Sequence, residues 1–149
     1  MSSFIGDNTC KADNKCRVVV PASFRKAMVA SCQSVFVLRK NVFEKCLDMY
    51  PMDEWERMIA DIRSKLNLFN AKHVAFLREF CRGTQEVEMD TNGRVLLPRK
   101  MLEEVGIDKE MVFAGQDVLI QVWDAKTYEE VAVGPDVLSD LAKEIFKSE

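Results

Sequence analysis

The sequence predicts an α+β fold in which two related units, each of about 45 residues, share one hydrophobic core. Residues 13–21 read DNKCRVVVP and residues 90–98 read DTNGRVLLP, so both contain Asp-x-x-x-Arg, three aliphatic residues and proline. The similarity between the two copies continues beyond the motif, because Phe36 matches Phe113 at the same offset of 77 positions. In each copy the pattern then reads strand, helix, strand, strand. One such unit buries too little apolar surface to fold comfortably alone, whereas two facing units build a common core.

Each copy is expected to begin with a polar lead-in that ends at the aspartate of the motif. A turn follows, for which Gly93 supplies a residue suited to positive φ in the second copy. Pro21 and Pro98 stop the short strand and open a helix, where the missing N–H costs nothing. The expected strands are 17–20, 35–39, 46–50, 94–97, 111–114 and 118–123, and the expected helices are 21–29 and 98–105.

A helical connector is predicted between the copies. Asp53 is the expected N-cap of its first helix, with Glu56 completing a capping box, and apolar residues then recur at helical spacing up to Phe69. A second helix is expected over residues 71–82, ending at Gly83. The predicted organisation is therefore unit 1 over 7–54, a helical connector over 55–82, unit 2 over 83–126 and a C-terminal helix over 136–149.

The last of these helices follows a chain break at Gly134-Pro135, and Asp136 is its expected N-cap. With the two connector helices it makes three amphipathic helices, which is more than a core of this size needs. The apolar stripes are expected mainly to pack within the core, and part of this surface is expected to form a subunit interface.

Composition predicts a cytoplasmic globular protein without a membrane span. No apolar run reaches the roughly 18 residues that a membrane-spanning helix needs, and the start of the chain lacks a signal-peptide pattern. The net charge of −3 argues mildly against nucleic acid, but the charge is unevenly distributed. Residues 11–26 contain five basic and one acidic side chain, whereas residues 86–104 contain three basic and five acidic ones. We therefore expect the first copy to dominate any contact with phosphate.

No catalytic, cofactor-binding or metal-binding pattern is present in the sequence. The five cysteines form no Cys-x-x-Cys pair, and His73 is the one histidine. There is no Ser/His/Asp set and no glycine-rich phosphate loop. The sequence therefore predicts a protein that is not an enzyme, with reduced cysteines, no cofactor, no metal and no small-molecule substrate.

The repeated Asp-x-x-x-Arg motif has two interpretations. In the structural one, Asp13 and Asp90 accept hydrogen bonds from turn amides and pair with the following arginine. In the functional one, a projecting turn carries arginine into a DNA groove, where it can bond two acceptors of guanine. The second interpretation predicts DNA contacts by these basic residues: Lys11, Lys15, Arg17, Arg25 and Arg94, with Lys26 as a further phosphate contact.

Several separate motifs, in order along the chain, resemble those of the MraZ family of bacterial transcriptional regulators, which consist of two SpoVT-AbrB-type units. Residues 13–21 are similar to the family's Asp-x-Lys-Gly-Arg-x-x-x-Pro signature, and residues 90–98 are similar to its second copy. Residues 47–55, LDMYPMDEW, are similar to its Tyr-Pro-x-x-x-Trp segment. The resemblance also includes positions near both ends of the matched region: Phe4, Gly6, Gly115 and residues 122–124.

This resemblance implies that each unit is half of a swapped-hairpin β-barrel and that the two halves complete one double-psi-like barrel with a pseudo-twofold axis. It implies a cytoplasmic, nucleoid-associated protein that forms rings of many subunits. The ring would bind G-rich promoter repeats upstream of the cell-division and cell-wall gene cluster. The DNA-contacting loop of the family corresponds to Lys15 and Arg17.

Two departures from the family signature and two rival functions accompany this interpretation. Cys16 replaces the signature glycine, so the first turn either changes its backbone angles or tolerates strain. Asn92 stands where the first copy has Lys15, so the second turn is the weaker DNA contact.

Two rival functions remain open. The first is an antitoxin-like or adaptor module, whose partner-binding arm would start at Gly134, and the second is an enzyme with a cysteine nucleophile.

Overall fold

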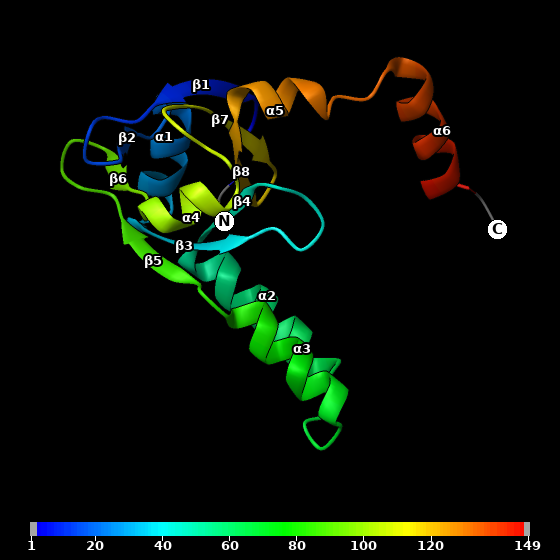
Figure 1. The fold of residues 1–149 in the computed structure, drawn as a ribbon. Helices are drawn as coiled ribbons and strands as arrows, with labels where there is room; N and C mark the ends of the chain where they lie inside the picture. The colour runs from blue at the N-terminus through cyan, green and yellow to red at the C-terminus, as the bar shows by residue number, and fades with distance from the viewer. Residues whose placement is uncertain (1–2, 148–149) are drawn as a thin grey trace.

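The protein is a mixed α+β structure dominated by an antiparallel sheet, as Figure 1 shows for the computed structural model, which describes residues 3–147. The strands are β1 Asp7–Lys11, β2 Arg17–Val19, β3 Val35–Lys40, β4 Leu47–Pro51, β5 Gln85–Glu88, β6 Arg94–Leu96, β7 Glu110–Gln116 and β8 Leu119–Asp124. The helices are α1 Ala22–Ala30, α2 Met52–Ser64, α3 Ala71–Cys81, α4 Arg99–Glu104, α5 Ala125–Glu130 and α6 Pro135–Ile145. The α+β class predicted from the repeat is confirmed.

The two copies exchange strands. The main sheet has the order β1-β7-β8-β4-β3-β5, and every neighbouring pair is antiparallel. In it, β1 of the first copy pairs with β7 of the second, and β5 of the second pairs with β3 of the first. Strands β2 and β6 form a separate two-stranded ribbon. Strands β1 and β5 are the edges of the main sheet, and no pairing within residues 3–147 joins them, so the hydrogen bonding describes an open sheet and does not show barrel closure.

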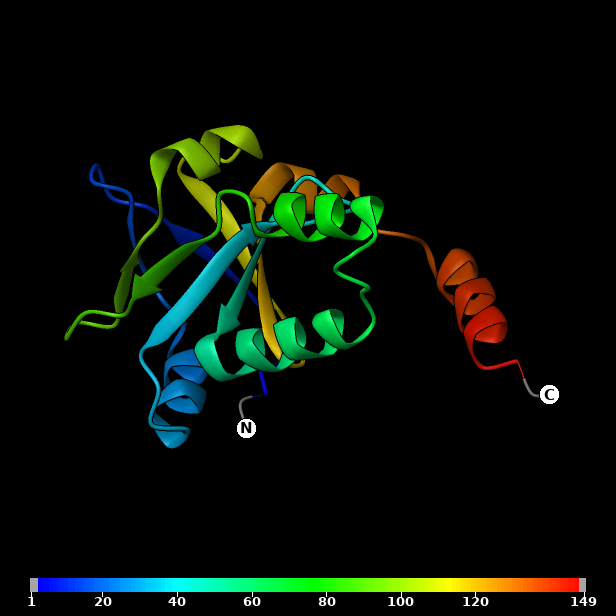
Figure 2. The same ribbon diagram turned by 90° about the horizontal axis from the view of Figure 1, so that it is seen from below.

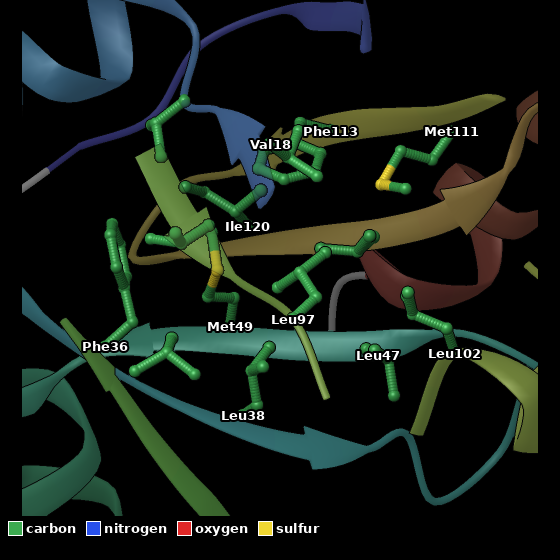
Figure 3. Close-up of a cluster of buried hydrophobic side chains, with 14 of the residues drawn as sticks. Val18, Phe36, Leu38, Leu47, Met49, Leu97, Leu102, Met111, Phe113 and Ile120 are labelled. Atoms are coloured by element: carbon green, nitrogen blue, oxygen red, sulfur yellow. The ribbon is translucent and has the colours of Figure 1, made fainter. Parts of the chain in front are cut away.

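The core is built by both copies together. Figure 3 shows side chains from both copies in one cluster, with Val18 of the first copy beside Phe113 of the second. Phe36 of the first copy and Leu97 of the second belong to the same cluster, and each of these four side chains is at most 1% exposed. Full burial of a side chain of this size contributes about 1.5–3 kcal/mol. Because neither copy could bury these residues without the other, the predicted shared core is confirmed.

Three short elements were not predicted from the sequence: β1, β5 and α5. The strands β1 and β5 are mostly polar and exposed, and they exist because β7 and β3 supply their hydrogen-bonding partners. Polar edge strands carry little periodic signal, so tertiary pairing decides their structure. The helix α5 is a six-residue segment that is capped by Asp124, whose carboxylate accepts a hydrogen bond from Thr127 N.

Two of the predicted helix caps were wrong, and two helices begin one residue later than expected. The N-cap of α2 is Pro51, so Asp53 lies inside the first turn of that helix. The N-cap of α6 is Gly134 with proline following it, so Asp136 is also a first-turn residue. Acidic residues in this position still complement the helix dipole. Pro21 and Pro98 are likewise N-caps, each one residue before its helix.

The helices outside the core point away from the ribbon. Figures 1 and 2 show the α2–α3 pair projecting from one side of the sheet and α6 standing apart from the rest of the molecule, while the β2–β6 ribbon lies at the opposite side. None of the helices in residues 3–147 is long and apolar enough to cross a membrane.

Candidate nucleic-acid interface

The β2–β6 ribbon has one buried face and one exposed face. Its register pairs Val18 with Val95, and both side chains are fully buried. Since side chains alternate along a strand, the residues on either side of each valine point outward. The outward face is formed by four residues, with the arginines at opposite corners: Arg17, Val19, Arg94 and Leu96. Val19 and Leu96 are more than half exposed, at 52% and 57%.

The turn that leads into β2, here called the first elbow (residues 13–17), is organised by one aspartate. Asp13 Oδ1 accepts hydrogen bonds from the backbone N–H groups of Lys15 and Arg17, each at 2.9 Å. Its Oδ2 accepts from Arg17 Nε at 2.8 Å. The Arg17 side chain remains 35% exposed, and within residues 3–147 its two Nη atoms have no hydrogen-bond partner. The elbow therefore holds the guanidinium by its inner edge and leaves its outer edge free.

The second elbow (residues 90–94) repeats this bonding atom for atom. Asp90 Oδ1 accepts from the N–H groups of Asn92 and Arg94 at 2.8 and 2.9 Å, and its Oδ2 accepts from Arg94 Nε at 2.9 Å. The backbone N–H of the arginine is the largest cause that lowers the pKa of each elbow carboxyl group, Asp13 and Asp90, below its ordinary value. The structural interpretation of the motif is thus confirmed, and it leaves both arginines at the surface.

Cys16 and Gly93 occupy the same backbone conformation in the two elbows. Their φ angles are +62° and +75°, both in the left-handed region. The left-handed conformation costs a residue with a Cβ about 1–2 kcal/mol, whereas glycine adopts it without this cost. Cys16 keeps the turn because its carbonyl accepts from Leu97 N at 2.9 Å, matching the bond from Val20 N to the Gly93 carbonyl. Of the two outcomes expected for Cys16, the structure has the strained one.

Because the copies exchange strands, Arg25 of the first copy lies against the second elbow and not against the first. Its Nη1 donates to the Val20 carbonyl oxygen, and its side chain lies over Gly93, where a Cβ would overlap Arg25 Cδ. Arg25 is therefore half-buried and braces the turn of the other copy. The position that matches it 77 residues on is Leu102, so the first elbow has no equivalent brace.

Arg99 is a site residue that the sequence analysis missed. It begins α4 of the second copy, and its Nη2 donates to the Asn14 carbonyl oxygen in the first elbow at 3.3 Å. The residue that corresponds to it in the first copy is Ala22, so no equivalent cation reaches the second elbow from this position. The sequence held no signal for this contact, because it depends on the strand exchange that places the start of each copy's helix beside the other copy's turn.

The grooves on either side of the ribbon have opposite charge. A groove of about 370 Å³ lies between β1 and β2 and includes Lys11 and Arg25 in its lining. The corresponding groove between β5 and β6, of about 350 Å³, includes Glu86 and Glu88. Of the remaining predicted cations, Lys11, Lys15 and Lys26 are exposed. The β2 side of the ribbon is thus the one that suits an anionic partner. Its groove is lined by Val19, Val20 and Arg25, at the end of β2 that meets the second elbow.

Two of the cysteines, Cys10 and Cys46, do not resemble catalytic thiols. All five are free, and burial raises the pKa of Cys10 to about 11 and that of Cys46 to about 12. Reactive cysteines instead have lowered pKa values, because the thiolate is the nucleophile. Among the described residues there is no group of three or more His, Cys, Asp or Glu side chains that could hold a metal ion.

Comparison with known proteins matches the chain to one family over nearly its whole length. A family model described as "MraZ protein, putative antitoxin-like" matches residues 3–79 and again residues 80–133. A transcriptional regulator MraZ from Christiangramia forsetii is 37% identical over 147 residues, covering 98% of this chain and 94% of that protein. One from Bacteroides fragilis is 34% identical over 149 residues, covering 100% and 94%. A third, from Clostridium tetani, is 35% identical over 85% of both chains.

Proposed function

The chain belongs to the MraZ family, and from this premise we propose that it is a transcriptional regulator that binds double-stranded DNA sequence-specifically. The observation that carries the proposal is the first elbow, where Arg17 is fixed through its Nε and presents two free Nη atoms to solvent. An arginine held in this way can donate two hydrogen bonds to O6 and N7 of guanine in the major groove. The two-stranded ribbon that carries it is also an element that fits this groove.

The charges around the first elbow support the same partner. Lys15 is in the turn, Lys11 precedes it at the end of β1, and Arg99 reaches the elbow from the second copy. Contacts of lysine and arginine with phosphates position a protein on DNA, and base contacts then specify the sequence. We assign Lys11, Lys15 and Arg99 to phosphate contacts and Arg17 to guanine. Arg94 makes a weaker contact, and Arg25 acts mainly by bracing the second elbow.

A homo-oligomer explains how so small a contact surface achieves useful affinity. One elbow offers one base-reading arginine and a few phosphate contacts. Several identical elbows on a ring that each meet one DNA repeat would raise avidity by 10²–10⁴ if the spacings match. We therefore propose a ring that binds G-rich promoter repeats of the cell-division and cell-wall gene cluster. The protein would act in the cytoplasm, associated with the nucleoid.

The same proposal includes the division of the chain and the completed barrel. The family model matches twice, which supports two units. We place these units at residues 7–54 and 83–126 and the helical connector at 55–82. The C-terminal helix predicted over 136–149 is α6, Pro135–Ile145, and the last two residues of the predicted range lie outside the described residues. The strand exchange between the copies supports a swapped-hairpin arrangement whose two halves form one double-psi-like barrel.

The test is binding to a duplex with G-rich repeats, measured by fluorescence anisotropy at several salt concentrations, with a scrambled duplex as the control. Each neutralised phosphate contributes about −0.9 to the slope of log K against log salt. We expect preference for the repeat and a slope of several units. Absence of binding, or binding that does not change with salt, would reject the proposal.

An antitoxin-like or adaptor function is the second candidate, and the description of the family model favours it. The exposed α6 that follows Gly134 would then be the arm that holds a partner protein. Recovery of a second protein in stoichiometric amount from cells, together with no affinity for the repeat duplex, would support this candidate over the first.

A further inference from the structure

The C-terminal helix α6 presents an apolar face that this chain does not cover. Five of its apolar side chains are 44–81% exposed: Val137, Leu138, Leu141, Ile145 and Phe146. Figures 1 and 2 both show α6 apart from the body, connected through the exposed residues 131–134. An isolated helix shorter than about 12–15 residues is marginal in water, so its stability depends on tertiary packing. A helix of 11 residues with this exposure needs a partner surface.

A second apolar surface, which the chain covers only in part, lies on the α2–α3 pair. In α2 the single buried side chain is Glu54, while the apolar residues at helical spacing remain partly exposed: Trp55, Met58, Ile59 and Ile62, followed by Leu66. In α3 the single buried residue is Phe80, which stacks on Trp55 near the body of the molecule. Figure 2 shows the two helices separated along their length and joined at their far end by residues 65–70. The chain therefore covers the apolar residues of this pair only in part, and on α3 Val74 and Phe76 are 37% and 46% exposed.

The charges on these two surfaces are complementary. Residues 135–146 contain three acidic and one basic side chain, a net charge of −2. The three acids, Asp136, Asp140 and Glu144, are spaced four residues apart and so form one row beside the apolar face. Residues 52–82 contain six basic and five acidic side chains, a net charge of +1. Three of the acids, Asp53, Glu54 and Glu56, lie in the first residues of α2, so the rest of the pair, residues 57–82, carries a net charge of +4. Within the described part of the chain, Arg63 has no ion pair and is exposed.

We propose that α6 of one copy docks on the α2–α3 pair of a second copy, with its apolar face against the α2 and α3 stripes and its acidic row toward Arg63 and Arg78. The inference rests on the self-association that is part of the proposed function, and it identifies the surfaces that make the contact. Each copy then gives one helix and receives one, which is a heterologous contact. Such contacts close into a ring when the rotation between neighbours permits it.

The docking is tested by placing a charge in each half of the contact. Leu141→Asp disables the helix that is given, and Ile62→Asp disables the surface that receives it. Ser139→Asp and Ala60→Asp are matched controls, because both residues are exposed and lie away from the apolar stripes. We expect native mass spectrometry to show the unmodified chain and both controls as oligomers. Each disabled variant should associate at least about 10-fold more weakly, since burial of one leucine or isoleucine contributes that much.

An equal mixture of the two disabled variants gives the sharpest result. The first retains an intact receiving surface and the second an intact helix, so the mixture should form a one-to-one pair at concentrations where each variant alone stays monomeric. Assembly of the Leu141→Asp variant like the unmodified chain would overturn the proposal, and so would a mixture that stays monomeric. If the unmodified chain is itself monomeric, self-association fails as well. Repeat binding by that monomer, measured in the same samples, would leave the DNA-binding proposal intact.

Discussion

The two elbows have the same backbone and different surroundings. In both, one aspartate accepts two turn amides and the arginine Nε, with distances that agree within 0.1 Å. Around this common frame the first elbow has Lys15 and receives Arg99, whereas the second has Asn92 and is braced by Arg25. The hydrogen bonds of the motif thus determine its shape. A few neighbouring positions determine what it binds.

The difference also shows why the count of charges along the sequence is only an approximate guide. The five basic residues of 11–26 do not all gather at the first elbow, because Arg25 packs on Gly93 of the second copy. Arg99, which the count assigns to the acidic half, lies at the first elbow. The asymmetry predicted from the sequence therefore remains, but it is made by different residues.

The largest expected effect is a difference in DNA affinity between the Arg17→Ala and Arg94→Ala variants. Arg17→Ala should weaken binding to the repeat duplex at least about 100-fold, because one bidentate contact with guanine is worth about 1–3 kcal/mol and is lost at every elbow. Arg94→Ala should weaken it less than about 5-fold. Anisotropy titrations with both variants measure the difference, and Lys126→Ala in α5 serves as a control on the remote side. Equal losses in the two variants would remove the functional asymmetry.

The comparison is sharpened by giving the second elbow the cations of the first. Glu88 and Asn92 correspond to Lys11 and Lys15, so the double variant Glu88→Lys/Asn92→Lys converts the second groove and turn. Tighter binding is expected, together with a salt slope that steepens by about 0.9 for each new phosphate contact. The reciprocal variant Lys15→Asn should make the slope shallower. A slope that does not respond to the double variant would mean that the second elbow does not face DNA.

A stability difference follows from the residue at the left-handed position. Gly93→Ala should destabilise the fold by about 1–2 kcal/mol through its φ of +75°, with a further loss because the new Cβ displaces Arg25. Gly83→Ala is the matched control, because its φ is +74° and no atom lies within 4 Å of an added Cβ. Thermal unfolding measures both. Adding Arg25→Ala should remove the excess loss at Gly93, and an unchanged excess would show that Arg25 does not brace the turn.

The smallest expected effect is the loss of folding stability at low pH that comes from Asp13 and Asp90. Because the folded pKa values of Asp13 and Asp90 are depressed, each carboxylate stabilises the native state above its unfolded pKa, and this contribution disappears as the pH falls through the folded value. Carboxyl chemical shifts followed by NMR should give two similar pKa values, both below that of an ordinary aspartate. An ordinary value at one of them would show that the two elbows differ in their hydrogen bonds in solution.

The sequence predicted the turns and strands that depend on local residue types. It missed the strands and side-chain positions that depend on pairing between the two copies. The bonding of Asp13 and Asp90 to their turns followed from residue type and spacing, and so did the strands that carry aliphatic runs. Strands β1 and β5 were missed, because their polar residues become strands through partners in the other copy. For the same reason the positions of Arg25 and Arg99 could not be predicted, since each reaches across to the opposite elbow.

The central claim is that the first elbow meets DNA more closely than the second, and photo-crosslinking tests it directly. Asn14 and Thr91 are matched exposed residues, one near the tip of each elbow. A photo-crosslinking amino acid is introduced at either position, and the protein is irradiated with the repeat duplex. We predict strong crosslinking from position 14 and weak crosslinking from position 91. Equal yields, or a higher yield from position 91, would contradict the account.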